Sequence, residues 1–166
     1  MSRSSTREQL LAELGDEVRA SQRTTDVHDD VLCELLGVNR TDGRCLDILD
    51  QTGPMTAGQL AQASALSTGA VTAVVDRLER AGYARRFSDP ADRRRVVVEL
   101  TPAARERSWE LMGSLATEGA RLAEPYSDEQ LQMFIEFARL GRALQERHTE
   151  WLRERVRERK DSPTGR

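Results

Sequence analysis

Apolar residues in the first third of the chain recur every three or four positions, which is the spacing of amphipathic helices. One such stripe lies in Thr6–Arg23 and a second in Val27–Val38, where Gly37 is of the residue type that often ends a helix. A third helix is expected to start with Thr41 as its N-cap and to end at Gly53 and the proline after it. The pattern therefore predicts three helices, with apolar positions at Leu10, Leu11, Leu14, Val18, Val31, Leu32, Leu35, Leu36, Cys45, Leu46, Ile48 and Leu49.

Two short helices follow with almost no linker between them. Thr56 can cap the first, and only Ser64–Leu66 separates it from the second, which Ser67 can cap and Gly82 can end. The second helix has a small, polar face opposite an apolar face that consists of Val71, Val74, Val75 and Leu78. Two helices that abut in this way predict a helix-turn-helix.

A β-hairpin is expected directly after these helices. Tyr83–Phe87 and Val96–Leu100 are rich in β-branched, aromatic and apolar residues, and the segment between them contains a proline and three consecutive arginines. A helix-turn-helix followed by such a hairpin is a winged helix.

Two long helices are expected to complete the chain. Thr101 and the proline after it mark the start of one that runs to about Ala123, and after Pro125 a final helix can begin at Ser127 and continue to about Arg159. The predicted fold class is mainly α with a small β-hairpin: a winged helix-turn-helix flanked by N- and C-terminal helices. The predicted divisions are residues 1–37 (N-terminal support or dimerisation helices), 38–101 (winged helix-turn-helix), 102–160 (C-terminal dimerisation helices) and 161–166 (disordered tail).

The terminal helices carry more apolar surface than a winged helix of ~60 residues can cover. The surplus includes Leu10, Leu14, Phe134, Phe137, Leu144 and Trp151. Either these helices form a bundle within one chain, or they pack against a partner.

Composition excludes several classes of protein. Of the 166 residues 38% are apolar and 32% are charged, which is a globular balance. No stretch approaches the ~18 uncharged apolar residues of a membrane-spanning helix, and residues 1–13 carry charges where a signal peptide would be apolar, so we expect a cytoplasmic protein. Cys33 and Cys45 do not have disulfide-framework or zinc-ligand spacing, and the acidic neighbours of Cys33 are expected to raise the pKa of its thiol.

The charge of the chain is unevenly distributed. The formal net charge is −3, and residues 1–66 contain 6 Arg against 11 acidic residues. Residues 83–98 contain 5 Arg against 2 Asp. A local basic segment in an acidic protein is what a small contact with a phosphate backbone requires.

This segment and the second short helix predict a binding surface for double-stranded DNA. The helix can enter the major groove, about 12 Å wide, while the hairpin lies over adjacent backbone or minor groove. Three consecutive arginines repel one another unless an anion binds them. The plainer alternative for the arginines is a solvated turn, and for the second short helix it is an ordinary capped helix without DNA contacts. The candidate contacts are Ser67, Thr68, Gly69, Thr72, Arg77, Arg85, Arg86, Asp92, Arg93, Arg94 and Arg95.

At these motifs the chain resembles the MarR-type winged-helix regulators. The resemblance rests on Met55–Ala61, on Ser67–Thr72 and Val75–Tyr83, and above all on Asp89–Arg95 through Leu100–Pro102, which is similar to the family's wing signature. It spans most of Thr6–Arg159 and implies a homodimer, most typically a repressor, that sets two wings on a pseudo-palindromic operator.

The resemblance also implies roles for single residues. Arg94 would be the wing-tip arginine that reaches the minor groove, and Asp92 would orient it through an ion pair. Many relatives have a long basic or polar side chain where this chain has Ala73, so base readout is expected to depend on Thr68 and Thr72. Relatives often bind a small aromatic or anionic effector in a cleft, which His28, Arg40, Arg44 and Trp109 could border.

An enzymatic function has little support in the sequence. The only histidines are His28 and His148, neither in metal-ligand spacing, and no glycine-rich phosphate loop occurs, so we expect no metal, cofactor or catalytic residue. The alternative function is that of an adaptor, a winged helix that makes protein contacts without sequence-specific DNA binding. The arginine-rich wing argues against it.

Overall fold

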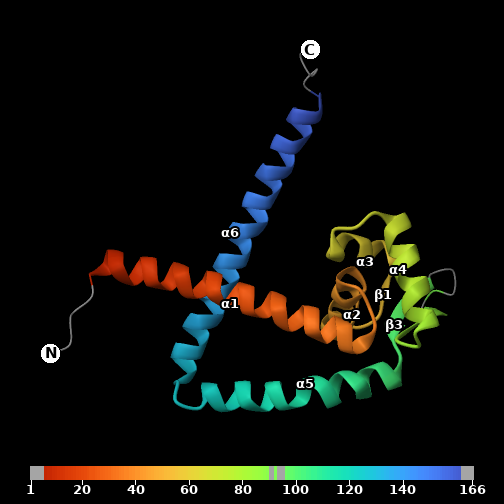
Figure 1. Ribbon diagram of the computed structural model, residues 1–166, viewed down its shortest axis with the longest axis horizontal. Coiled ribbons are helices and arrows are strands. Elements are labelled where there is room, and N and C mark those ends of the chain that lie inside the picture. Colours follow the sequence, from red (N-terminus) through yellow and green to blue (C-terminus); the bar gives the residue numbers. More distant parts are fainter. Residues whose placement is uncertain (1–5, 90–91, 93–95, 162–166) are drawn as a thin grey trace. The chain divides into compact units, whose positions relative to one another are not determined.

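The computed structural model describes residues 6–89, 92 and 96–161 (Figure 1). By its internal contacts the chain divides into two compact units, residues 1–111 and 112–166. The first unit contains the predicted winged helix, which confirms the predicted fold class, and the second contains most of the C-terminal helices.

The first helix, α1 (Arg7–Leu36), is longer than the sequence pattern suggested. The predicted break between residues 23 and 27 is wrong: one helix of 30 residues runs through it. No glycine or proline lies between residues 23 and 27. The Thr24 hydroxyl donates a hydrogen bond to the Ala20 carbonyl 3.1 Å away, one turn earlier. The predicted end is confirmed, because Gly37 has a left-handed backbone (φ 67°) and its N–H bonds back to the last turn.

The next helix, α2 (Arg40–Thr52), begins two residues before the expected position. Asn39, not Thr41, is its N-cap, and the Asn39 side chain accepts a hydrogen bond from the Asp42 N–H. Asparagine caps helices at least as well as threonine, so the earlier cap takes precedence. The helix ends at Gly53, as predicted.

The helix-turn-helix consists of α3 (Ala57–Ser64) and α4 (Thr68–Arg80). The predicted caps Thr56 and Ser67 are both confirmed: each accepts a hydrogen bond from the backbone N–H three residues later. Between the helices, Ala65 adopts a left-handed backbone conformation (φ 57°), which is unusual for a residue with a side chain.

The sheet has three antiparallel strands in the order β1-β3-β2. The predicted hairpin is confirmed as β2 (Ala84–Ser88) and β3 (Val96–Leu100). The sequence did not indicate β1 (Met55–Thr56), because two residues are too few to show an alternating pattern. Met55 pairs with Val98, so β1 lies on the free edge of β3.

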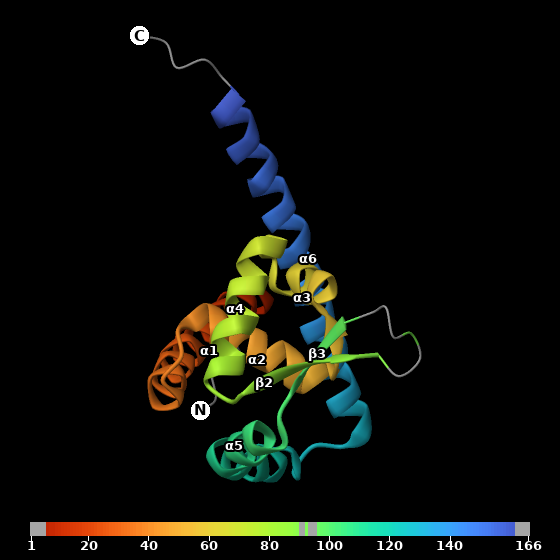
Figure 2. The ribbon, with the colours of Figure 1, turned by 90° about the vertical axis from the view of Figure 1, so that its right-hand side faces the viewer.

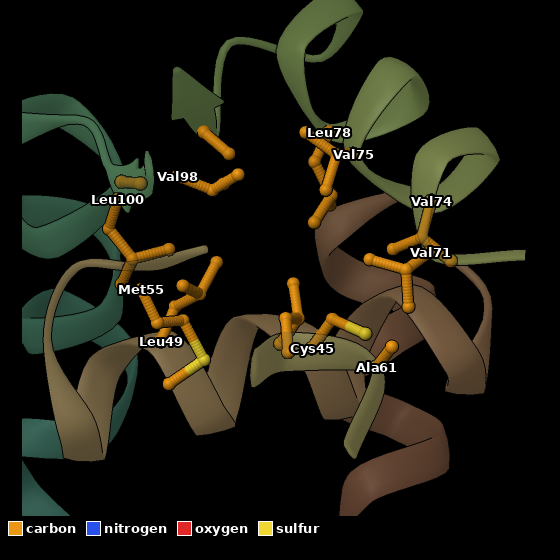
Figure 3. Close-up of a cluster of buried hydrophobic side chains, with 13 residues drawn as sticks. Cys45, Leu49, Met55, Ala61, Val71, Val74, Val75, Leu78, Val98 and Leu100 are labelled. Carbon is orange, nitrogen blue, oxygen red and sulfur yellow. The ribbon is translucent and has the colours of Figure 1, made fainter. Parts of the chain in front are cut away.

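The core of the first unit lies between the sheet and helices α2, α3 and α4. Figure 3 shows the apolar face of α4 meeting residues from α2 and β3. All four predicted face residues of α4 are buried, and the fully buried partners include Cys45, Leu49, Leu60 and Val98. Burial of one face leaves the opposite face of α4 exposed, which positions the candidate interface.

Helices α5 (Pro102–Ala123) and α6 (Asp128–Asp161) begin where the sequence predicted. The Thr101 hydroxyl accepts a hydrogen bond from the Ala104 N–H (3.1 Å), and the Ser127 hydroxyl accepts one from the Gln130 N–H (3.3 Å). In the described part of the chain, no helix combines the length and apolar content needed to cross a membrane.

Candidate nucleic-acid interface

The start of α4 presents small, polar and exposed residues. Thr68, Gly69 and Thr72 are all exposed. A side chain built at Gly69 would meet nothing within 4 Å, so the fold itself does not require glycine there and a partner can come close to the backbone. The Thr72 hydroxyl donates to the Thr68 carbonyl (3.0 Å), which leaves its oxygen able to accept a hydrogen bond from a base.

Arg77 lies at the flank of α4 that faces α2, and its side chain is bound within the protein. Its Nε and Nη2 atoms donate to the two oxygens of Asp42, at 2.8 and 2.5 Å. Asp42 is buried, and the Asn39 amide also donates to it (3.0 Å). The hydrogen bond to Asp42 raises the pKa of Arg77. The pair connects the N-terminal end of α2 to the candidate recognition helix. Figure 2 shows the ribbons of α2 and α4 next to each other.

Arg86 lies at the opposite flank of α4, on β2, and it too is bound within the protein. Its guanidinium forms ion pairs with Glu79 and with Asp76 (2.7 Å), both on α4. The Arg86 backbone N–H donates to the second oxygen of Glu79 (2.8 Å). Strand β2 is therefore bound to α4 through side chain and backbone together.

Arg85 pairs across the hairpin. It faces Glu99 on β3, and its Nη2 lies 2.5 Å from the Glu99 carboxylate. Its side chain remains 60% exposed, so it can still approach a phosphate.

Among the candidate residues at the wing tip, the structure describes Asp92. This residue is exposed, and its N–H donates a hydrogen bond to the Asp89 carbonyl (3.2 Å). The candidates Arg93, Arg94 and Arg95 lie outside the described residues.

The candidate effector residues are only partly brought together. Arg40 lies at the start of α2 among three aspartates of α1, with ion pairs of 2.9, 3.6 and 3.1 Å to Asp26, Asp29 and Asp30. His28 lies 3.3 Å from Asp29, so it shares this cluster. Arg44 is exposed on α2 and Trp109 is 70% exposed on α5. An open groove of about 680 Å³ is lined by Asn39, Arg40, Thr41, Ala70, Ala73, Val74 and Arg77.

Both cysteine thiols have a raised pKa. For Cys33 the direction matches the prediction, but burial is the largest cause and the neighbouring aspartates contribute less, while Arg40 opposes them. Burial is also the largest cause for Cys45. In the part of the chain that the structure describes, no three His, Cys, Asp or Glu side chains form a group that could hold a metal ion.

Sequence reasoning identified the arginines and missed their carboxylate partners. Asp76 and Glu79 are three apart on α4 and close to the basic segment, so their spacing offered a signal. Asp42 precedes Arg77 by 35 residues, and nothing in the sequence connects the two.

Comparisons with known proteins show which family the chain is similar to. The MarR family model matches residues 38–96. An HTH-type transcriptional regulator of Bacillus subtilis, YcgE, is 38% identical over 146 residues, which are 88% of this chain and 90% of YcgE. The HTH-type transcriptional repressor NicR of Pseudomonas putida is 35% identical over 85 residues, which are 45% of this chain and 53% of NicR.

Solved structures show the same fold. A MarR family regulator from Silicibacter pomeroyi superposes with a TM-score of 0.62 at 23% identity, covering 89% of this chain and 98% of that one. A mutant of S. aureus MepR bound to an oligodeoxyribonucleotide gives 0.52 at 21% identity, covering 79% and 97%. NadR in complex with 4-hydroxyphenylacetate gives 0.56 at 16% identity, covering 82% and 92%.

Proposed function

The chain belongs to the MarR family of transcriptional regulators, and from this premise we propose that it is a homodimeric repressor that binds a pseudo-palindromic DNA operator. In this proposal α4 enters the major groove and the hairpin of β2 and β3 contacts adjacent backbone or minor groove. The observation that carries the proposal is the exposed face of α4, where small polar side chains lie opposite a fully buried apolar face. The name of the relative NicR supports the repressor role.

The homodimer is supported by exposed apolar side chains on both terminal regions. Isolated apolar residues are common on protein surfaces, but extended apolar stretches mark interfaces. Exposed apolar residues lie on α1 (Leu10, Leu11, Leu14, Val18), on α5 (Trp109, Leu115, Leu122) and on α6 (Met133, Phe134, Ile135, Phe137, Leu140, Leu144, Trp151, Leu152, Val156). Packing of these helices against a second copy would remove this surface from water. Sedimentation is expected to give twice the chain mass of 18.7 kDa, and a monomer at micromolar concentration would refute the dimer.

Base readout can be tested at Thr72 with a closely matched control. Thr24 on α1 is also exposed, and its hydroxyl makes the same bond to a carbonyl one turn earlier, 3.1 Å against 3.0 Å for Thr72. Operator fragments are first selected from genomic DNA by the purified protein. Thr72→Val is then expected to weaken binding to the selected site by up to ~1–3 kcal/mol and to leave random duplex nearly unaffected. Thr24→Val is expected to change neither affinity, and equal effects of the two variants would contradict readout by α4.

The adaptor alternative predicts a different dependence on salt. A dimer that makes ~6–10 phosphate contacts loses roughly 10³–10⁵ in affinity for duplex DNA between 50 and 200 mM salt. An adaptor that acts through protein contacts would show weak affinity for duplex DNA, or an affinity that salt does not change.

The proposal includes relief of DNA binding by a small aromatic or anionic effector. The NadR complex with 4-hydroxyphenylacetate supports this by analogy of fold. Arg40 lines the groove beside α4 and stays 42% exposed although it pairs with three aspartates of α1. Release of labelled operator is measured against a panel of aromatic carboxylates. An active compound should lose potency with Arg40→Gln, whereas a panel without any active compound removes support for this part of the proposal.

A further inference from the structure

Helix α4 is held from both flanks by arginine ion pairs of opposite polarity. Toward α2 the helix supplies the cation, Arg77, and α2 supplies the carboxylate, Asp42. Toward the hairpin α4 supplies the carboxylates, Asp76 and Glu79, and β2 supplies the cation, Arg86. Both arginines are among the DNA contacts that the sequence predicted, Arg77 on the second short helix and Arg86 in the basic segment.

On the first flank, the carboxylate cannot easily release its arginine. The Asp42 side chain is only 4% exposed, and both of its oxygens accept from the guanidinium fork of Arg77. If Arg77 turned toward a phosphate, Asp42 would remain as a buried anion with only the Asn39 amide beside it. The new phosphate contact would have to offset that cost. The fork also fixes the rotation of α4 about its axis, because two parallel bonds restrain the donor more than one.

On the second flank, Arg86 binds three successive turns of α4. Besides its ion pairs with Asp76 and Glu79, its Nη2 lies 3.5 Å from the Thr72 carbonyl. The Arg86 side chain is 30% exposed, against 60% for its neighbour Arg85. The bond from the Arg86 N–H to Glu79 ties the strand itself to the helix. A shift of the hairpin relative to α4 would break these contacts together.

We propose that Arg77 and Arg86 are positioning residues, which hold the recognition helix in register with α2 and with the wing and do not contact DNA phosphates. The inference rests on the proposed DNA binding. If the two arginines act in this way, α4 and the hairpin of β2 and β3 contact DNA as one rigid unit. The two arginines then determine how well the preferred site is distinguished from random duplex, while the salt dependence of binding comes from other cations.

The test replaces arginine by lysine, which keeps the charge and loses the planar fork. A lysine at position 86 can still contact a phosphate, but its single nitrogen cannot reproduce the separate bonds that Nη1 makes to Glu79 and Nη2 makes to Asp76. We therefore expect Arg86→Lys to keep the slope of log affinity against log salt. The ratio of affinities for selected and random duplex is expected to fall about tenfold, the discrimination of one misplaced base contact. The same outcome is expected for Arg77→Lys.

The charge-neutral variant separates the two roles further. Each phosphate contact adds about 0.9 to the salt slope, so loss of one contact in each of two subunits would lower it by about 2. Arg86→Gln is expected to leave the slope unchanged and to lower the ratio as Arg86→Lys does. The proposal would be overturned if Arg86→Gln lowered the salt slope by about 2 and weakened binding to selected and random duplex equally. It would also be overturned if Arg86→Lys kept the wild-type ratio of the two affinities.

Glu79→Gln is the companion variant, and it decides the question if the arginine variants do not fold. It keeps Arg86 and removes the carboxylate that holds both its side chain and its N–H. If Arg86 is a positioning residue, Glu79→Gln lowers the ratio of affinities for selected and random duplex. The Glu79→Gln/Arg86→Lys double variant then lowers this ratio no further than the single variants do. A phosphate-contacting Arg86 would predict a ratio at the wild-type value. If the wild-type protein binds no duplex DNA the proposed function itself fails, which the wild-type measurement shows before any variant is compared.

Discussion

Gly43→Ala tests how closely α1 crosses α2, and two opposing effects determine its outcome. Gly43 lies within α2, where alanine is favoured over glycine by about 0.5–1 kcal/mol. A Cβ at this position would stand less than 3.0 Å from the Sγ of Cys33 on α1, closer than real side chains approach. Cys33 is 8% exposed and belongs to a packed helix, so its sulfur has little room to move.

The net effect can be estimated from these two terms. Overpacking of a buried contact costs about 1–3 kcal/mol, which exceeds the gain in helix propensity, so we expect Gly43→Ala to destabilise the protein by roughly 1–2 kcal/mol. Cys33→Ala removes the obstructing sulfur at the cost of a small cavity, about 1 kcal/mol. In that background Gly43→Ala is expected to stabilise the protein, because only the propensity term remains.

The assay is a double-mutant cycle, in which urea unfolding is followed by circular dichroism. All variants are measured at one protein concentration, because the stability of the proposed homodimer would depend on concentration. The coupling energy between the two positions is expected to be about 1–3 kcal/mol. Gly58→Ala in α3 is the matched control, because outside the helix's own backbone the nearest atom to its new Cβ is the Thr56 Oγ1 at 4.0 Å. If Gly43→Ala stabilises the wild-type protein as much as it stabilises Cys33→Ala, the close crossing is refuted.

Three further predictions concern other parts of the first unit. Ala65→Gly should raise the free energy of unfolding by about 0.5–1 kcal/mol, because it relieves a left-handed backbone; an unchanged urea midpoint would contradict this. Arg77→Met should lower the free energy of unfolding by about 2–4 kcal/mol, since it leaves the Asp42 carboxylate, only 4% exposed, without its cation. Asp42→Asn should lower it by only about 1–2 kcal/mol, since Arg77 is 39% exposed and can reach water. Equal losses in urea unfolding would refute this difference. The raised pKa of Cys33 and Cys45 favours the thiol form in the folded state, so stability should be fully present below the ordinary thiol pKa of about 8.5 and should decline above it. Iodoacetamide should label both far more slowly in the folded protein than in urea, which mass spectrometry can follow.

Helix boundaries that depend on neighbouring residues could be predicted from the sequence. Thr56 and Ser67 cap their helices through a bond to the residue three positions later, and Gly37 ends α1 through bonds to its last turn. Such interactions span at most four residues, so the local pattern contains them completely. The two wrong predictions also concern local signals. A break after residue 23 was predicted although no glycine or proline lies there, and Thr41 was chosen as the N-cap although Asn39, a better cap, precedes it.

The exposed polar face of α4 was likewise determined by the sequence, because its apolar positions repeat at helical spacing and bury the opposite side. The partners of its arginines were decided only by the tertiary structure. Arg77, Arg86 and the wing arginines look alike in the sequence, yet the fold places a buried Asp42 beside the first and two carboxylates of α4 beside the second. Charge counts along a chain ignore distance in space, whereas the energy of an ion pair depends on that distance and on the exclusion of water.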